Sequence, residues 1–264
     1  MVFDFLINFL FNATKRYKKK LIIKEISNFN SSRIIYGAYK SAFINSIGKF
    51  SGDLPAKLLG IYEEQVQNKI IELCKKKNLK FLINFGAGDG YHVIGLIKNK
   101  IFEKALAFEI DNKIKKRLIY NIKKNNVSSK ILVLGKASFR DISKFINYED
   151  LKKSLFLVDI EGEEFSLFSK KNLTYFKNSY LIIENHQTLI SNKKNLIKKF
   201  FLLMKNNFKL IKIYHSNKNP FTIESIKNLN EDTKWLAMSE CRNTNQDWIF
   251  CIPKKIRRLN NLSN

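Results

Sequence analysis

From residue 81 to residue 214, apolar segments of strand length alternate with segments of helical pattern. The apolar segments are continuous runs without a polar face, which is typical of strands in a parallel sheet that helices cover on both sides. The expected strands are 81–85, 104–109, 130–135, 154–160, 179–185 and 208–214. Because parallel neighbours need a crossover helix between them, this alternation predicts a doubly wound α/β sheet of mostly parallel strands.

The two ends of the chain lack this alternation. Residues 234–240 and 247–253 are short and close together, and we expect them to pair as antiparallel strands at a sheet edge. Upstream of the first strand the pattern is mainly helical. The expected organisation is a helical N-terminal extension, a Rossmann-like α/β domain and a basic tail, at 1–60, 61–253 and 254–264.

The turn after the first expected strand has the sequence INFGAGDG at 83–90, with glycines at alternate positions. Glycine lets a backbone approach a ligand closely, and the next helix start offers free N–H groups. A dinucleotide site has GxGxxG spacing, whereas the spacing here is GxGxG. Glu109 ends the second strand, where a carboxylate can accept hydrogen bonds from both ribose hydroxyls. These features favour S-adenosylmethionine as the cofactor; the alternative is a plain tight turn beside a surface glutamate.

Four segments resemble motifs of the FkbM-like family, which belongs to the class I S-adenosylmethionine-dependent methyltransferases. They are INFGAGDGYHVIGLI, ALAFEIDN, LVDIEGEEFSLF and YLIIENH. The resemblance covers roughly residues 55–253, and DIEGEE is its most specific part. It implies a Rossmann-like sheet of about seven strands whose last strand is antiparallel. It also implies O-methylation of a hydroxyl, with a saccharide, glycan or glycolipid as the acceptor.

The resemblance assigns expected roles to particular residues around the cofactor. The expected cofactor-binding residues are Asn84, Gly86, Ala87, Gly88, Gly90, Glu109, Lys136 and Ala137. Asn84 departs from the pattern, because many class I enzymes carry an acidic residue two positions before the first glycine. We therefore expect a lower affinity for the cofactor.

Polar side chains follow the fourth and fifth expected strands. They are Asp159 and Glu161 after the fourth strand, and Glu184 and His186 at the end of the fifth. We expect this group to be catalytic, with His186 as general base because an ordinary histidine pKa lies near neutrality. Such a base typically contributes ~10²–10⁴-fold in rate. The alternatives are a structural histidine, or a divalent cation held by Asp159, Glu184 and His186, which we do not expect.

Three further residues are expected to contact the acceptor. His92 follows the glycine loop, and Glu240 and Arg242 lie near the last expected strand. The alternatives are that His92 only packs and that Glu240 and Arg242 form a salt bridge at a sheet edge.

The chain is strongly basic, with 48 Lys and Arg against 23 Asp and Glu, a formal net charge of +25. Lysine greatly outnumbers arginine, which is the usual reader of phosphates and base edges. We therefore expect a solvated lysine surface that attracts an anionic acceptor, and we disfavour nucleic acid as partner. Two alternatives remain open: an RNA-binding or RNA-methylating protein, and a cofactor-binding protein without catalysis.

The N-terminal sequence MVFDFLINFLF precedes a basic cluster, KRYKKK at 15–20. No run reaches the ~18 apolar residues of a membrane span. We expect a helix docked on the domain, and the alternative is contact of residues 1–25 with anionic lipid at the inner face of a membrane. The three cysteines form no closely spaced pair, which fits a reducing, cytoplasmic compartment.

Overall fold

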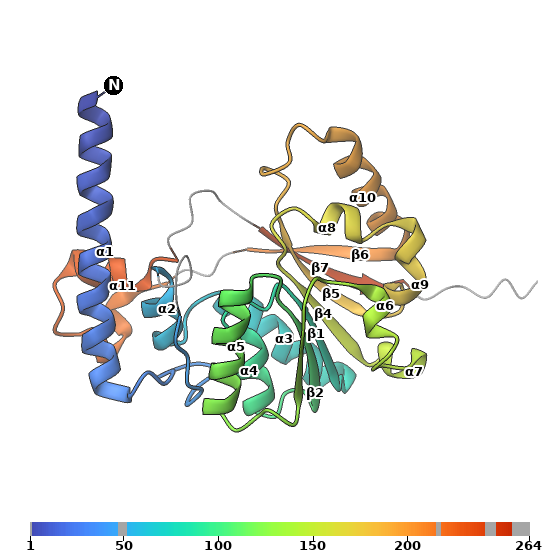
Figure 1. Ribbon diagram of the computed structural model, residues 1–264, viewed down its shortest axis with the longest axis horizontal. Helices are drawn as coiled ribbons and strands as arrows, with labels where there is room; N and C mark the ends of the chain where they lie inside the picture. Colours follow the sequence, from blue (N-terminus) through green and yellow to red (C-terminus); the bar gives the residue numbers. More distant parts are fainter. Residues whose placement is uncertain (1, 47–51, 215–217, 241–246, 255–264) are drawn as a thin grey trace, which may run out of the picture.

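The computed structural model describes residues 2–46, 52–214, 218–240 and 247–254 (Figure 1). A seven-stranded sheet runs through its centre in the order β3-β2-β1-β4-β5-β7-β6. The strands are β1 (Phe81–Phe85), β2 (Lys104–Phe108), β3 (Ile131–Leu134), β4 (Ser154–Val158), β5 (Tyr180–Asn185), β6 (Phe208–Ile213) and β7 (Asp247–Pro253). Neighbouring strands are parallel except where β7 lies between β5 and β6. The predicted fold class, a mostly parallel doubly wound sheet with an antiparallel last strand, is confirmed.

The expected pairing of residues 234–240 with 247–253 is wrong. The first segment belongs mainly to α11 (Glu231–Met238), whose N-cap Asn230 accepts a hydrogen bond from the backbone N–H of Thr233. A capping side chain followed by acidic residues stabilises the start of a helix. The second segment forms β7, which pairs with β5 and β6 inside the sheet instead of forming an edge.

Helices cover both faces of the sheet, as the continuous apolar strands require (Figure 1). One face carries α3 (Glu64–Lys77), α4 (Tyr91–Lys98) and α5 (Asn112–Lys124). The other carries α6 (Phe139–Ile142), α7 (Tyr148–Leu151), α8 (Glu164–Leu167), α9 (Leu173–Phe176) and α10 (Lys194–Asn207). Leu82 and Ile83, adjacent in β1, enter different apolar clusters because successive strand side chains point to opposite faces.

The chain before β1 contributes α1 (Val2–Asn30) and α2 (Leu54–Leu59), and every residue of α2 is buried. The inner half of α1 lies against α2 and α11, where Ile22 and Ile26 are buried. Its outer half stands clear of the body (Figure 1). No helix in the described part of the chain is long and apolar enough to cross a membrane.

Short 3-10 turns complete the described chain at η2 (Lys170–Asn172), η3 (Pro220–Thr222) and η4 (Glu224–Ile226). The η4 turn lies beside α1, so the helical extension contacts the late part of the chain as well as α2. The division of the chain at residues 60 and 253 stays a prediction.

Candidate functional site

Two cavities flank the glycine loop at the carboxyl end of β1. The larger has a volume of about 860 Å³ and is lined by residues that follow β1, β2, β3 and β4. The smaller has a volume of about 30 Å³ and lies toward α2 and β7. Gly86, Gly88 and Asp159 line both cavities. Ligands of open α/β sheets bind at this edge, so the two cavities form one candidate site.

The glycine loop follows a path that other residues rarely adopt. Gly86 has a φ of +77°, and a Cβ there would lie 1.7 Å from the backbone oxygen of Asp159. Gly90 has a φ of +94°, and a Cβ there would lie 2.6 Å from side-chain atoms of Leu118 in α5. Of these three glycines, Gly86 and Gly88 line the two cavities, whereas Gly90 is not among the described residues that line them. The lack of a side chain at Gly90 lets α4 pack closely against α5, and its expected role in cofactor binding stays a prediction.

Glu109 lies in the wall of the larger cavity, and 8% of the residue is exposed. Its Oε2 accepts a hydrogen bond of 2.9 Å from the N–H of Gly88, and its Oε1 accepts one of 2.8 Å from the N–H of Asp111. Each carboxylate oxygen can accept more than one hydrogen bond, so Glu109 keeps acceptor capacity for a ligand. Lys136 and Ala137 line the same cavity, as expected.

The smaller cavity is lined by buried charged side chains. The ammonium of Lys57 lies 2.8 Å from Oδ2 of Asp89, and both residues are 2% exposed. Asp89 also accepts a hydrogen bond from the hydroxyl of Ser46. Trp248 is 1% exposed, and its Nε1 has no hydrogen-bond partner within the described residues. Because an unmet buried donor is costly, this indole N–H indicates a ligand acceptor in the smaller cavity.

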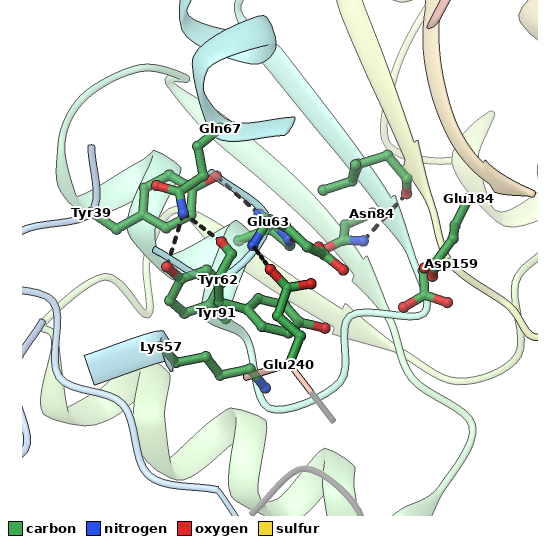
Figure 2. A network of polar contacts seen from close by, with 12 residues as sticks. Tyr39, Lys57, Tyr62, Glu63, Gln67, Asn84, Tyr91, Asp159, Glu184 and Glu240 are labelled. Carbon is green, nitrogen blue, oxygen red and sulfur yellow. Dashed lines mark hydrogen bonds and ion pairs between the residues drawn. The ribbon is translucent and has the colours of Figure 1, made fainter. Parts of the chain in front are cut away.

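Glu63 connects this cavity to a wider polar network (Figure 2). Its Oε2 lies 2.7 Å from Nε2 of His92, whose Nδ1 lies 3.0 Å from the hydroxyl of Tyr39. The backbone N–H of Glu63 donates to Oε1 of Glu240, which pairs with Lys218. Glu63 has a φ of +47°, which is uncommon for a residue with a side chain, and it is the N-cap residue of α3.

Asn84, Ala87 and Arg242 complete the set of expected residues. Asn84 is 3% exposed and donates a hydrogen bond of 3.2 Å to the backbone oxygen of Leu157, so its amide is tied to β4. Ala87 lines the smaller cavity only. Arg242 lies outside the described residues. Of the residues expected to contact the acceptor, His92 lies in the network around the smaller cavity and Glu240 at its margin.

The structure brings together the expected catalytic residues. Nε2 of His186 lies 3.3 Å from Glu184, 3.5 Å from Asp159 and 3.8 Å from Glu161. Its Nδ1 lies 3.2 Å from Oε1 of Glu164, which is 1% exposed. In Figure 2 the carboxyl groups of Asp159 and Glu184 lie beside one another. The ends of β4 and β5 thus form one carboxylate–histidine group.

The expected near-neutral pKa of His186 is wrong. Burial alone would lower this pKa, but hydrogen bonds to Glu164 and Glu184 and the charge of Asp159 outweigh it and raise the pKa to about 10. The pKa of Asp159 is raised well above its ordinary value, first by burial and then by the Glu184 carboxyl. At neutral pH the imidazole therefore holds its proton.

Asp159, Glu184 and His186 each offer one atom that could bind a metal, and these atoms lie within 4.8 Å of one another. A protonated His186 already places a positive charge between the two carboxyl groups. The proton on His186 can therefore balance the charge of these carboxyl groups without a metal ion. That the protein requires no metal stays a prediction.

Sequence reasoning missed Lys57, Glu63, Trp248 and Glu164. Glu163 and Glu164 follow DIEG directly, and Glu164 accepts hydrogen bonds from the backbone N–H groups of Gly162 and His186. Its signal is the last position of DIEGEE, the most specific part of the resemblance. Lys57 and Glu63 precede the first expected strand, in a part of the chain to which the sequence assigns no site residue.

The sequence matches no protein-family model and no curated protein. Similar solved structures include an O-methyltransferase from Bacillus cereus in complex with SAH. It is 12% identical in sequence, the match covers 92% of this chain and 97% of that chain, and the TM-score is 0.49. An rRNA methylase from Streptococcus thermophilus is 9% identical, with 72% and 95% covered and a TM-score of 0.47. TrmK from M. capricolum in complex with S-adenosyl-homocysteine is 17% identical, with 71% and 67% covered and a TM-score of 0.40.

These likenesses concern the fold alone, and the strand order of the sheet carries the fold assignment independently of them. Since no family model matches, the FkbM-like resemblance stays a prediction.

Proposed function

We propose that this chain is an S-adenosylmethionine-dependent methyltransferase of the FkbM-like type. The observation that carries the proposal is the pair of cavities that share Gly86, Gly88 and Asp159 in their walls. One would suit a nucleoside and the other an amino-acid zwitterion. S-adenosylmethionine consists of these two parts. When bound, it supplies an electrophilic methyl group on a sulfonium.

The larger cavity suits the adenosine half. Glu109 would accept hydrogen bonds from the ribose hydroxyls, since it lines the cavity and backbone N–H groups hold its carboxylate in place. Ile110 is 69% exposed at this cavity and offers an apolar surface to a flat base. Lys136 and Ala137 would lie along the base edge.

The smaller cavity suits the methionine half. Lys57 and the unmet indole N–H of Trp248 would bind its carboxylate, and Glu63 would bind its ammonium. Asn84 is neutral and cannot supply the charge of the acidic residue that many class I enzymes have at that position. Glu63 would offset this loss from another segment of the chain.

Asp159 borders both cavities and would act at their junction. Methyl transfer would break the bond between sulfur and the methyl carbon, leaving its electron pair on the sulfur of S-adenosylhomocysteine. Asp159 would take the proton of the acceptor hydroxyl on a carboxyl oxygen as the new bond between oxygen and carbon forms. The raised pKa of Asp159 suits it to hold that proton. His186 is a positioning residue in this scheme, because its proton lies between Asp159 and Glu184 and Glu164 fixes its ring.

The proposed acceptor is a hydroxyl of a saccharide in a glycan or glycolipid. This follows from the sequence resemblance, and the net charge of +25 favours an anionic acceptor. The same charge favours RNA as the competing acceptor, and label transfer separates the two.

The test is transfer of a radiolabelled methyl group from S-adenosylmethionine. The acceptors are methyl glucuronide, methyl glucoside and methyl rhamnoside in one set of reactions, and transfer RNA in another. Label in a glycoside, lost in Asp159→Asn and kept in the matched surface variant Asp141→Asn, supports the proposal. Label in RNA alone assigns the chain to RNA methylation instead.

A further inference from the structure

The outer half of α1 exposes large apolar side chains. From residue 6 to residue 18, every side chain that the structure describes is exposed except the half-buried Lys15. Leu6, Ile7, Phe9, Leu10 and Phe11 are 50–64% exposed. Figure 1 shows this half extending away from the sheet and its helices. At a rise of 1.5 Å per residue, residues 6–18 of the helix span about 20 Å.

The inner half of the same helix is held firmly. Ile22 and Ile26 are 2% exposed in the core. Lys19 is 4% exposed, and its ammonium donates to the backbone oxygens of Gly52 and Ser239, the latter at 2.9 Å. A short helix with solvent on all sides is marginally stable in water, so a partner that covers the outer half would stabilise it.

The distribution of these apolar side chains distinguishes between partners. At 100° per residue, positions 6, 7, 9, 10 and 11 cover about 200° of the helix circumference. A second helix buries a narrow stripe and would leave much of this surface in water. A lipid phase can surround the helix end and cover all of it.

Basic residues lie between the apolar end and the body. Arg16, Lys18, Lys20 and Lys24 are exposed and Lys15 is half-buried, and they point in several directions around the helix. Such a basic segment next to an apolar one is complementary to a bilayer with anionic headgroups.

We propose that α1 is a membrane-docking helix that recognises anionic lipid. Its outer apolar end enters the boundary between headgroups and acyl chains, and its basic residues meet the lipid phosphates. This inference is independent of the proposed methyl transfer.

The test is co-sedimentation of the full chain with vesicles of phosphatidylcholine alone or with phosphatidylglycerol added. One variant replaces Leu6, Phe9, Leu10 and Phe11 by Gln, and its matched control replaces the exposed Phe145, Leu189, Leu202 and Phe221 by Gln. A charge variant replaces Lys15, Arg16, Lys18 and Lys20 by Gln. Its matched control replaces Lys194, Lys198, Lys199 and Lys205 in α10 by Gln, on the far side of the molecule from α1 (Figure 1).

The wild-type chain and both controls should bind the anionic vesicles, more weakly as salt rises, and bind neutral vesicles poorly. Each α1 variant should bind anionic vesicles at least about ten-fold more weakly, with thermal unfolding of the remaining domain unchanged. The proposal is overturned if the α1 apolar variant binds vesicles as well as its control does.

Two other occupants would also be detected. If the wild-type chain is a dimer that does not bind vesicles, and the α1 apolar variant is a monomer, the outer half of α1 is an interface between two copies. If transfer RNA binds the chain and the α1 charge variant alone weakens it, with no vesicle binding, the basic segment serves RNA. Either result overturns the lipid assignment.

Discussion

The two cavities on either side of the glycine loop are built by different means. The larger is shaped by backbone turns at the ends of consecutive strands, and Glu109 in its wall is held by nearby N–H groups. The smaller is lined by buried residues from two segments that are distant in sequence, Lys57 and Glu63 in one and Trp248 in the other. A small cavity with buried charge accepts only a ligand of complementary charge, because an unmatched buried charge is costly. Affinity for the nucleoside and selectivity for the amino-acid half should therefore depend on different residues.

The largest effect is expected at Gly86, which both cavities share. In Gly86→Ala the added Cβ would meet the backbone oxygen of Asp159 at 1.7 Å, in a backbone conformation with positive φ. We expect a loss of about 5 kcal/mol or more in the free energy of unfolding, measured by urea denaturation. Gly135→Ala is the control, because a Cβ there meets nothing within 4 Å among the described residues. Equal stability of the two variants would contradict the close approach of loop and β4.

The pH dependence of stability should report on the carboxylate–histidine group that borders both cavities. The pKa of His186 is raised in the folded state to about 10, so its stabilising contribution is complete below an unfolded-state pKa of 6.5 and is lost as pH rises toward 10. The stability difference between wild type and His186→Asn should shrink between these values, by up to the order of 4 kcal/mol. Urea denaturation from pH 6 to pH 10 measures it. A difference that stays constant with pH would mean that His186 is neutral in this group.

Trp248→Phe should distinguish the contributions of the two cavities to ligand binding. Loss of the unmet indole N–H should leave the stability of the free protein unchanged or slightly raised. Binding of S-adenosylhomocysteine should weaken about ten-fold or more, since a hydrogen bond to a charged group is lost. Binding of 5′-methylthioadenosine, which lacks the amino-acid half, should not change. If calorimetric titrations show that both ligands bind equally more weakly, the assignment of the smaller cavity to the amino-acid half is wrong.

Metal removal should have the smallest effect. With a proton on His186 between Asp159 and Glu184, no cation is needed to balance these carboxyl groups. Treatment with EDTA should leave methyl transfer and ligand binding unchanged. Loss of transfer that Mg²⁺ or Mn²⁺ restores would show that these residues hold a metal.

The sequence predicts the larger cavity better than the smaller one, for a physical reason. The spacing of Gly86 and Gly88 and the strand-end position of Glu109 are local features, so a linear pattern can reveal them. The pair of Lys57 and Asp89 joins positions 32 residues apart and depends on how α2 meets the glycine loop. Burial of such a charge is visible only in the folded chain.

Two errors have the same origin. Residues 234–240 are apolar enough for a strand, and only the cap at Asn230 with the acidic residues after it indicates a helix. The pKa of His186 depends on carboxyl groups from β5, α8 and the turn after β4, which no single segment reveals. The parallel sheet, by contrast, is encoded in each strand separately as a continuous apolar run.

The most direct test of the two-part cofactor site is calorimetric titration of the purified protein with S-adenosylhomocysteine, using Glu109→Gln and the exposed control Glu103→Gln. One-site binding is expected for wild type and control, with at least about ten-fold weaker binding in Glu109→Gln, because the amide replaces a charged acceptor of the ribose hydroxyls. Failure of folded wild-type protein to bind, or equal binding by both variants, would contradict the assignment of these cavities to S-adenosylmethionine.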